Sequence, residues 1–109
     1  MLMFEQYNQY YTQCDREDFL KCDILMMNYD DKVSILSILN TFKFNVTNKS
    51  SFVIEFSDVE YNRKSNKVSS GKIYMSDDEY YYVYNGRYYK CDQLEGLEKF
   101  IKDLHDKVI

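Results

Sequence analysis

The spacing of hydrophobic and polar positions changes from a helical to a strand-like period part-way along the chain. Residues 2–14 place apolar or aromatic side chains three and four positions apart, which predicts a helix. Residues 19–27 alternate in a way that favours a strand, although a helix fits almost as well because Leu and Met are good helix formers. Residues 31–42 predict a helix capped by Asp30 or Asp31. The apolar stripe of that helix consists of Ile35, Leu36, Leu39 and Phe42.

From Phe44 onward the hydrophobic period is two, which is typical of strands with one buried face. Residues 52–57 alternate in this way and predict a half-buried strand. Residues 62–71 are polar and predict a long loop, after which a second strand starts over residues 72–75. This half of the chain is therefore expected to build an antiparallel sheet.

A tight hairpin is the strongest local signal in the sequence. Asn85-Gly86 suits the positive φ angles of a type I′ turn, and it separates two strands predicted over residues 80–84 and 87–91. A turn of this length fixes the register of the two strands. The expected opposed pairs are Tyr84 with Arg87, Val83 with Tyr88, Tyr82 with Tyr89, and Tyr81 with Lys90.

The last predicted element is a helix over residues 93–107. Asp92 is expected to cap it, and Glu95 completes a capping box. The apolar stripe consists of Leu94, Leu97, Ile101, Leu104 and Val108, and the expected ion pairs are Glu95–Lys99, Glu98–Lys102 and Asp103–Lys107. The patterns together predict a single α+β domain over residues 1–109. It has a helical N-terminal half, an antiparallel meander with the Asn-Gly hairpin, and a C-terminal helix packed on the sheet.

Composition adds information about source and compartment. The chain has 109 residues, 12 of them Tyr, and contains no Pro, Trp or Ala, which favours an AT-rich genome such as that of a low-GC Gram-positive bacterium or its phages. Codon bias is therefore expected to account for part of the tyrosine excess. The sequence contains neither a long apolar run nor a secretory leader, so we expect a cytoplasmic protein. Its cysteines, Cys14, Cys22 and Cys91, are expected to be reduced thiols.

Residues that commonly carry catalysis or bind metals are sparse. The single histidine, His105, is expected on the exposed side of the final helix, which is a poor place for a catalytic base. The glycines Gly71, Gly86 and Gly96 cannot form a phosphate-binding loop. The cysteines and the acidic clusters lack the spacing of zinc or calcium sites. We therefore expect no enzymatic activity, no metal and no cofactor.

The tyrosines of the hairpin divide between two faces of the sheet. One face carries Tyr80, Tyr82, Tyr84, Arg87, Tyr89 and Cys91, and the other carries Tyr81, Val83, Tyr88 and Lys90. Because a helix covers only one face, several tyrosines are expected to stay exposed. Tyrosine is a good strand former, which is the simpler explanation, but it is also enriched at protein interfaces.

Charge is unevenly distributed along the chain. The net charge is −4, while residues 61–72 contain Arg63, Lys64, Lys67 and Lys72 without an acidic residue. The acidic residues gather at residues 15–18, 30–31, 58–60 and 77–79. Such clusters are usually solvated turns, but together they produce a negative field that attracts a basic partner. The pI of about 4.9 argues against general nucleic-acid binding.

In size, acidity, tyrosine content and AT-rich composition the chain resembles the small inhibitors of phages and mobile elements, and among them the anti-CRISPR proteins. The resemblance implies an inhibitor that acts in a bacterial host cell. It would bind a basic nucleic-acid-handling protein, such as a CRISPR nuclease or its guide-RNA complex, by presenting carboxylates in place of phosphates. Two alternatives remain: an immunity protein or antitoxin that neutralises a nuclease toxin, and a self-assembling phage accessory protein.

The resemblance points to the acidic turn and the hairpin as the contact site. The expected partner-binding residues are Asp77, Asp78, Glu79, Tyr81, Tyr82, Tyr84 and Tyr88. Carboxylates there would pair with Arg and Lys of the partner, and exposed tyrosines would anchor the contact. The basic residues Arg63, Lys64, Lys67 and Lys72 are expected to reach phosphates of nucleic acid already bound to the partner.

Overall fold

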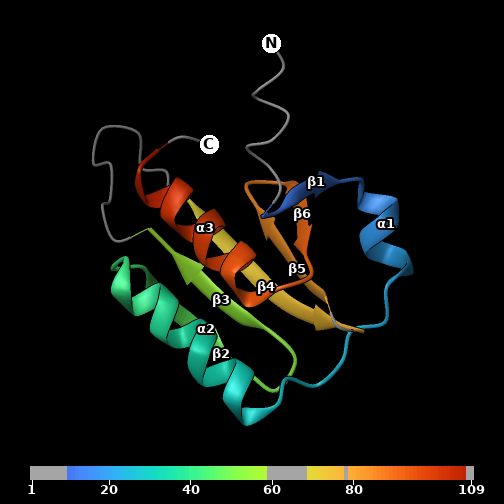
Figure 1. Cartoon of the computed structure of the whole chain (residues 1–109), viewed down its shortest axis with the longest axis horizontal. Coiled ribbons are helices and arrows are strands. Elements are labelled where there is room, and N and C mark those ends of the chain that lie inside the picture. The colour runs from blue at the N-terminus through green and yellow to red at the C-terminus, as the bar shows by residue number, and fades with distance from the viewer. Residues whose placement is uncertain (1–9, 59–68, 78, 108–109) are drawn as a thin grey trace.

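An antiparallel sheet of six strands forms the centre of the protein, in a computed structural model that describes residues 10–58, 69–77 and 79–107. The strands are β1 (Thr12–Cys14), β2 (Asn45–Lys49), β3 (Ile54–Ser57), β4 (Ser70–Ser76), β5 (Glu79–Tyr84) and β6 (Arg87–Cys91). The helices are α1 (Arg16–Lys21), α2 (Tyr29–Thr41) and α3 (Leu94–His105). The strand order is β1-β6-β5-β4-β3-β2, and α2 and α3 pack together on one face (Figure 1). The predicted α+β class is confirmed.

The hairpin forms as predicted. Asn85 and Gly86 adopt φ angles of 50° and 79°, the left-handed conformation that a type I′ turn needs. The register pairs Tyr84 with Arg87, Val83 with Tyr88, Tyr82 with Tyr89 and Tyr81 with Lys90. The strand over residues 52–57 begins two positions later than predicted, because residues 50–53 form the turn between β2 and β3.

The hydrophobic core lies between the sheet and the α2–α3 pair. Its fully buried side chains from the sheet are Ile54, Phe56, Ile73 and Tyr82, and those from the helices are Ile35, Leu39, Leu97, Phe100 and Ile101. Phe100 lies at the centre, with its ring centroid 4.3 Å from that of Tyr82 and 4.7 Å from that of Tyr89. Aromatic pairs at these spacings add to the free energy gained by burial. Part of the tyrosine content is therefore core.

Both long helices form close to their predicted ranges, but their N-caps differ from the prediction. Asn28 caps α2, because its Oδ1 accepts a hydrogen bond of 2.8 Å from the backbone of Asp31. Gln93 rather than Asp92 is the N-cap residue of α3, and its side chain makes no capping bond. Lys99 and Lys102 pair with Asp103 and Asp106, on their C-terminal side, rather than with the predicted Glu95 and Glu98.

The N-terminal region differs most from its predicted local structure. Residues 12–14, expected at the end of a helix, form β1 and pair with β6, because that pairing satisfies the open edge of β6. The acidic stretch over residues 15–18, for which a solvated turn was the usual expectation, caps and begins α1. The ambiguous segment over residues 19–27 divides: α1 ends at Lys21, and an extended segment follows with one bridge from Leu25 to Met75. Tertiary pairing overrides the local preference here.

Candidate functional site

The structure removes two of the expected tyrosine anchors from the surface. Tyr82 is fully buried beneath α3, and Tyr81 is only 6% exposed. Tyr81 lies on the face opposite α3, where α1 places Phe19 over it with the ring centroids 6.2 Å apart. The expectation that only one face of the hairpin is covered was wrong at this position, because α1 covers part of the second face. Neither ring is available to anchor a partner.

The two other expected tyrosines are partly buried and lie on opposite faces of the sheet. Tyr84 packs on the helix side, with its ring stacked 6.3 Å from that of Phe56. Tyr88 lies on the other side, with its ring 5.3 Å from that of Phe19. The structure therefore does not bring these tyrosines into one contact surface.

The expected charged residues are also separated. Asp77 is exposed and Glu79 is half-buried at the β4–β5 turn, where Glu79 accepts a hydrogen bond from the Tyr81 hydroxyl at 3.3 Å. Asp78 lies outside the described residues, as do Arg63, Lys64 and Lys67. Lys72 lies on β4, with its Nζ 4.0 Å from a carboxylate oxygen of Glu55.

Acidic residues from three parts of the chain meet at the end of the molecule where β4 turns into β5. The segment after α1 passes along this end, since the Leu25 amide donates to the Met75 carbonyl at 2.8 Å. The start of α2 is tied to the same end by the Tyr80 hydroxyl, which donates to Asp31 at 3.0 Å. We define the acidic end as Asp23, Asp30, Asp31, Asp77 and Glu79.

The acidic end perturbs the groups that it surrounds. Burial and the hydrogen bond to Asp31 raise the pKa of Tyr80 to about 12. The pKa of the Cys22 thiol is also raised, mainly by burial and further by the charges of Asp23 and Glu79. Asp31 therefore acts on Tyr80, whereas Asp23 and Glu79 act together on Cys22.

Large apolar side chains are exposed beside these carboxylates. Met26 is 63% exposed and Tyr29 is 78% exposed, and both belong to the segment that carries Asp23 and Asp30. Phe52 reaches the same region from the β2–β3 turn, because the Met27 amide donates to the adjacent Ser51 carbonyl at 2.8 Å. We define the apolar rim as Leu25, Met26, Tyr29, Val33 and Phe52, which are five of the seven exposed large hydrophobic residues in the described part of the chain.

Sequence reasoning missed the apolar rim. The alternation over residues 19–27 indicated a strand whose apolar side would be buried, and nothing in the pattern showed that the segment is extended at the surface. The run Leu25-Met26-Met27 was a usable signal, because neighbouring side chains of an extended segment point to opposite sides, so these three cannot all reach one core. Only Met27 is buried.

The described residues offer little of the geometry expected of an active site. His105 is exposed at the end of α3, with Nδ1 3.1 Å from Asp106 and the ring 5.6 Å from that of Phe42. Within residues 10–58, 69–77 and 79–107, no group of three His, Cys, Asp or Glu side chains is arranged to hold a metal ion. Over the same residues, no helix has the length and apolar character needed to cross a membrane. Comparison of the chain with protein-family models, curated proteins and solved structures finds no match.

Proposed function

We propose that this protein is a non-enzymatic inhibitor that binds a basic nucleic-acid-handling protein in the cytoplasm of a bacterial host. The most specific form of the proposal is an anti-CRISPR protein that blocks the nucleic-acid channel of a CRISPR nuclease. The observation that carries it is that the exposed Met26 and Tyr29 belong to the acidic segment over residues 23–31, which the Leu25–Met75 bridge ties to the strand leading into the acidic β4–β5 turn.

The two parts of this surface contribute differently to binding. Carboxylates of the acidic end attract a basic channel over a distance and orient the encounter, as phosphates of nucleic acid would. Exposed charges alone give little affinity, because water and salt compete for them. Tyr29 and Met26 supply the apolar area that most interfaces concentrate in a few residues. Exposed apolar patches rimmed by charge are typical of interaction sites.

The proposal keeps the acidic turn of the sequence-based hypothesis and changes its anchors. The expected carboxylates are still Asp77, Asp78 and Glu79. The expected apolar anchors are now Tyr29 and Met26, because Tyr81 and Tyr82 are buried. Tyr29 suits this role because a tyrosine ring gives a large contact area and loses little conformational entropy on binding. The acidic turn also lies close to the apolar rim through the Leu25–Met75 bridge.

A nuclease inhibition assay tests the proposal. CRISPR nucleases from low-GC Gram-positive bacteria would be mixed with the protein before guide RNA or target DNA is added, and cleavage of a labelled target would be measured. We expect the triple variant D77S/D78S/E79S and the double variant M26S/Y29S each to weaken inhibition by at least about tenfold. The control is E17Q/D92N, which removes two exposed carboxylates that belong to neither the acidic end nor the surroundings of the apolar rim.

The outcomes separate the candidate functions. Inhibition that is lost in both surface variants and kept in the control supports an anti-CRISPR protein. Inhibition that falls equally in the control would show attraction by net charge only and would contradict the assigned surface. Inhibition of a nuclease toxin but of no CRISPR nuclease would favour the immunity-protein alternative, which uses the same physical chemistry.

A further inference from the structure

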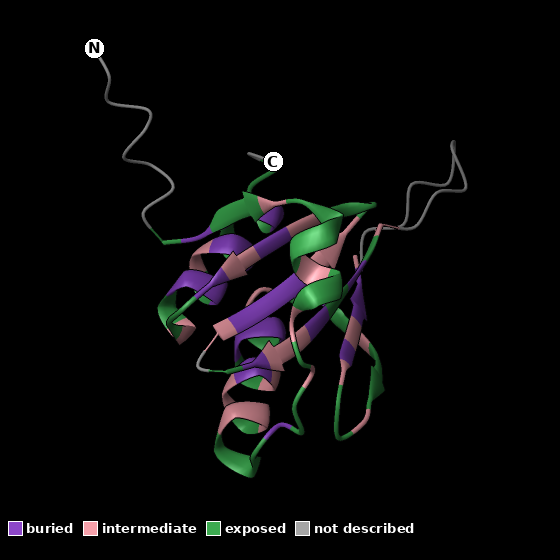
Figure 2. Ribbon diagram, turned by 90° about the vertical axis from the view of Figure 1, so that its right-hand side faces the viewer, coloured by how far each residue is buried: buried purple, intermediate pink, exposed green. Residues whose placement is uncertain are grey.

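The sheet face turned away from α2 and α3 is only partly covered. Alternation along the strands places Lys72, Val83 and Tyr88 in one row across β4, β5 and β6, and Tyr74, Tyr81 and Lys90 in the next. α1 covers one corner of this face and has no buried residue of its own (Figure 2). We define the open face as Phe19, Lys72, Tyr74, Val83, Tyr88 and Lys90.

Three aromatic rings form a wall on the open face. The Phe19 ring lies 5.2 Å from that of Tyr74 and 5.3 Å from that of Tyr88, measured between centroids. All three rings are partly exposed, whereas Tyr81 beneath them is buried. The wall therefore presents aromatic surface to the solvent and packs on the buried ring of Tyr81.

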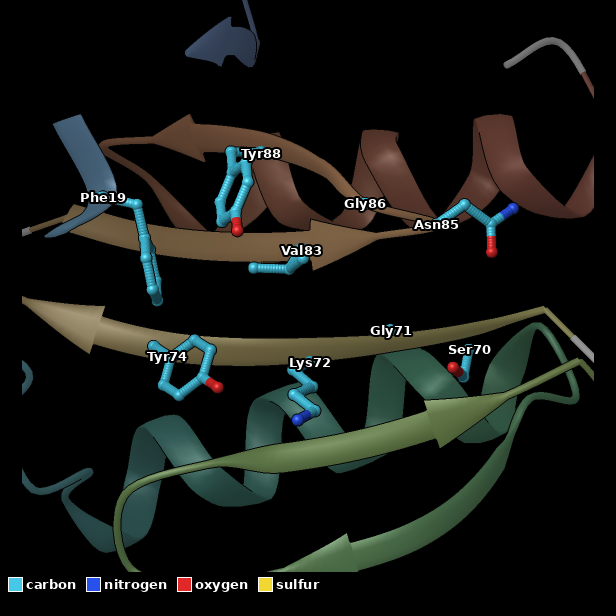
Figure 3. A pocket seen from close by; sticks show the side chains of 9 residues that line it. All are labelled: Phe19, Ser70, Gly71, Lys72, Tyr74, Val83, Asn85, Gly86 and Tyr88. Atoms are coloured by element: carbon cyan, nitrogen blue, oxygen red, sulfur yellow. The ribbon is translucent and has the colours of Figure 1, made fainter. Parts of the chain in front are cut away.

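A shallow cavity lies beside this wall. It has a volume of about 300 Å³ and extends from Phe19, Tyr74 and Tyr88 to the Asn85-Gly86 turn. Val83 and the backbone of Gly71 lie between these ends, and Lys72 stands on the near side of the sheet with its ammonium group in the solvent (Figure 3). The cavity thus combines an aromatic wall, an apolar floor and a cation.

The open face also carries positive charge in an otherwise acidic protein. The Lys72 side chain is 53% exposed, and Lys90 lies one row further along the face. Glu55 offsets Lys72 only weakly, because the two charged groups are 4.0 Å apart at an exposed position. Glu79 of the acidic end begins β5 and lies on this same face, where it accepts a hydrogen bond from the Tyr81 hydroxyl. It stands at the far end of β5 from the Asn85-Gly86 turn, whereas Lys72 pairs with Val83 near that turn.

We propose that the open face binds single-stranded nucleic acid, with a base stacked against the Phe19–Tyr74–Tyr88 wall and a backbone phosphate paired with Lys72. Aromatic rings beside lysines on a sheet surface have the two features that single strands need, a flat apolar platform and a cation for the phosphate. A duplex offers the phosphate but keeps its bases stacked inside. Glu79 and the rest of the acidic end repel phosphates, so a bound strand is expected on the part of this face between Lys72 and the Asn85-Gly86 turn.

Direct binding measurements test the proposal. The probe is a 5′-labelled twelve-nucleotide oligouridine or oligothymidine, titrated with the full chain at low salt and followed by fluorescence anisotropy. We expect single strands to bind and the same sequence annealed to its complement to bind at least about fivefold more weakly. The affinity is expected to decrease with salt, because lysine–phosphate contacts release counterions.

Matched variants assign the binding to the open face. K72Q is expected to lower the affinity by about fivefold and to reduce the slope of log K against log salt by about 0.7. K43Q is the control, because it removes the same charge from an exposed position at the end of α2. Y74A is expected to lower the affinity by at least about fivefold through lost stacking. E55Q is expected to raise it by about two- to threefold, since it frees Lys72.

Three results would overturn the proposal. The first is no binding of either oligonucleotide by the wild-type chain at low salt. The second is equal binding of single strand and duplex, which would indicate charge attraction only. The third is an equal effect of K72Q and K43Q. Lys72 is exposed, so K72Q is expected to stay folded, and a thermal melt of each variant excludes unfolding as the cause.

Discussion

The two faces of the sheet are built from alternate residues of the same strands, yet their surroundings differ. On the helix face, Tyr82 is fully buried beneath Phe100. On the open face, Tyr81 is covered by Phe19 from a helix of six residues that buries none of its own residues. The comparison shows that alternate tyrosines of one strand have different roles: those on the helix face fill the core, and those on the other face form a surface. Which set is covered depends on elements distant in sequence.

Removing the ring that covers each face gives the largest expected difference. Phe100 is fully buried and contacts three tyrosine rings of the core, so F100A should lower the free energy of unfolding by about 3–5 kcal/mol. F19A should cost about 1–2 kcal/mol, because the Phe19 ring is only partly buried. Urea denaturation followed by circular dichroism measures both. Equal losses would show that the two faces are equally part of the core.

Removing the hydroxyl from two buried tyrosines compares a hydrogen-bonded site with an unbonded one inside the core. Tyr11 donates a 2.6 Å hydrogen bond to the buried carboxylate of Asp103, so Y11F should lower the free energy of unfolding by about 1–3 kcal/mol. Within the part of the chain that the structure describes, the buried Tyr82 hydroxyl has no nitrogen or oxygen partner and has only the weakly bonding Cys91 thiol beside it, so Y82F should be neutral or stabilising. Each variant removes one oxygen from a buried ring. A loss in Y82F as large as that in Y11F would contradict this account of the core.

Alkaline pH compares one tyrosine from each face. The pKa values of Tyr80 and Tyr81 are both raised to about 12 from an ordinary 10, mainly by burial. The folded chain therefore holds these protons more tightly than the unfolded chain does. Their contribution to stability is complete below pH 10 and is lost as pH rises from about 10 through 12. The urea midpoint should fall between pH 9 and pH 11, and the Cys91 thiol, whose pKa burial raises to about 11, adds to that fall.

Phenylalanine variants assign this alkaline loss to the two residues. Y80F and Y81F remove the titrating hydroxyls and should each make the decrease between pH 9 and 11 smaller. Similar effects of the two variants would mean that Phe19 shields the Tyr81 hydroxyl from water as well as the helices shield that of Tyr80. A decrease that both variants leave unchanged would show that other groups cause it.

The last and smallest expected difference is in the alkylation rates of two cysteines, one from each face of the sheet. Cys91 is 5% exposed on the helix face, and burial raises its pKa to about 11. Cys14 lies opposite Tyr88 on the other face and is partly exposed, with a raised pKa as well. Both thiols should react slowly at pH 8, but Cys14 should be alkylated well before Cys91. Mass spectrometry of timed samples would detect the order, and the reverse order would contradict the assigned faces.

Much of the C-terminal half of the fold was predictable because its signals are local. Asn85-Gly86 fixed the hairpin register without help from other elements, and the apolar stripe of α3 placed Leu97, Ile101 and Leu104 in the core. The region before α2 was not predictable in the same way. β1 exists because β6 offers an unpaired edge, and an edge formed some 75 positions later leaves no periodicity in the sequence.

The candidate surfaces were less predictable than the fold. The acidic turn over residues 77–79 was visible from its composition, but its proximity to Asp23 and Asp31 depends on the Leu25–Met75 bridge and the Tyr80–Asp31 hydrogen bond. Tyr81 was assigned to the surface because nothing in the sequence showed that Phe19 would cover it. Exposure depends on long-range packing, and residue type alone does not determine it.

Affinity capture tests the central claim most directly, which is that the acidic end and the apolar rim bind a basic protein. The wild-type chain and the M26S/Y29S variant would be used as baits in a lysate of a low-GC Gram-positive bacterium with a CRISPR system, with and without nuclease digestion. The account predicts that a large basic nuclease is recovered by the wild-type bait in both arms and is lost with the variant. Recovery of no basic protein above the level of the variant bait would contradict it.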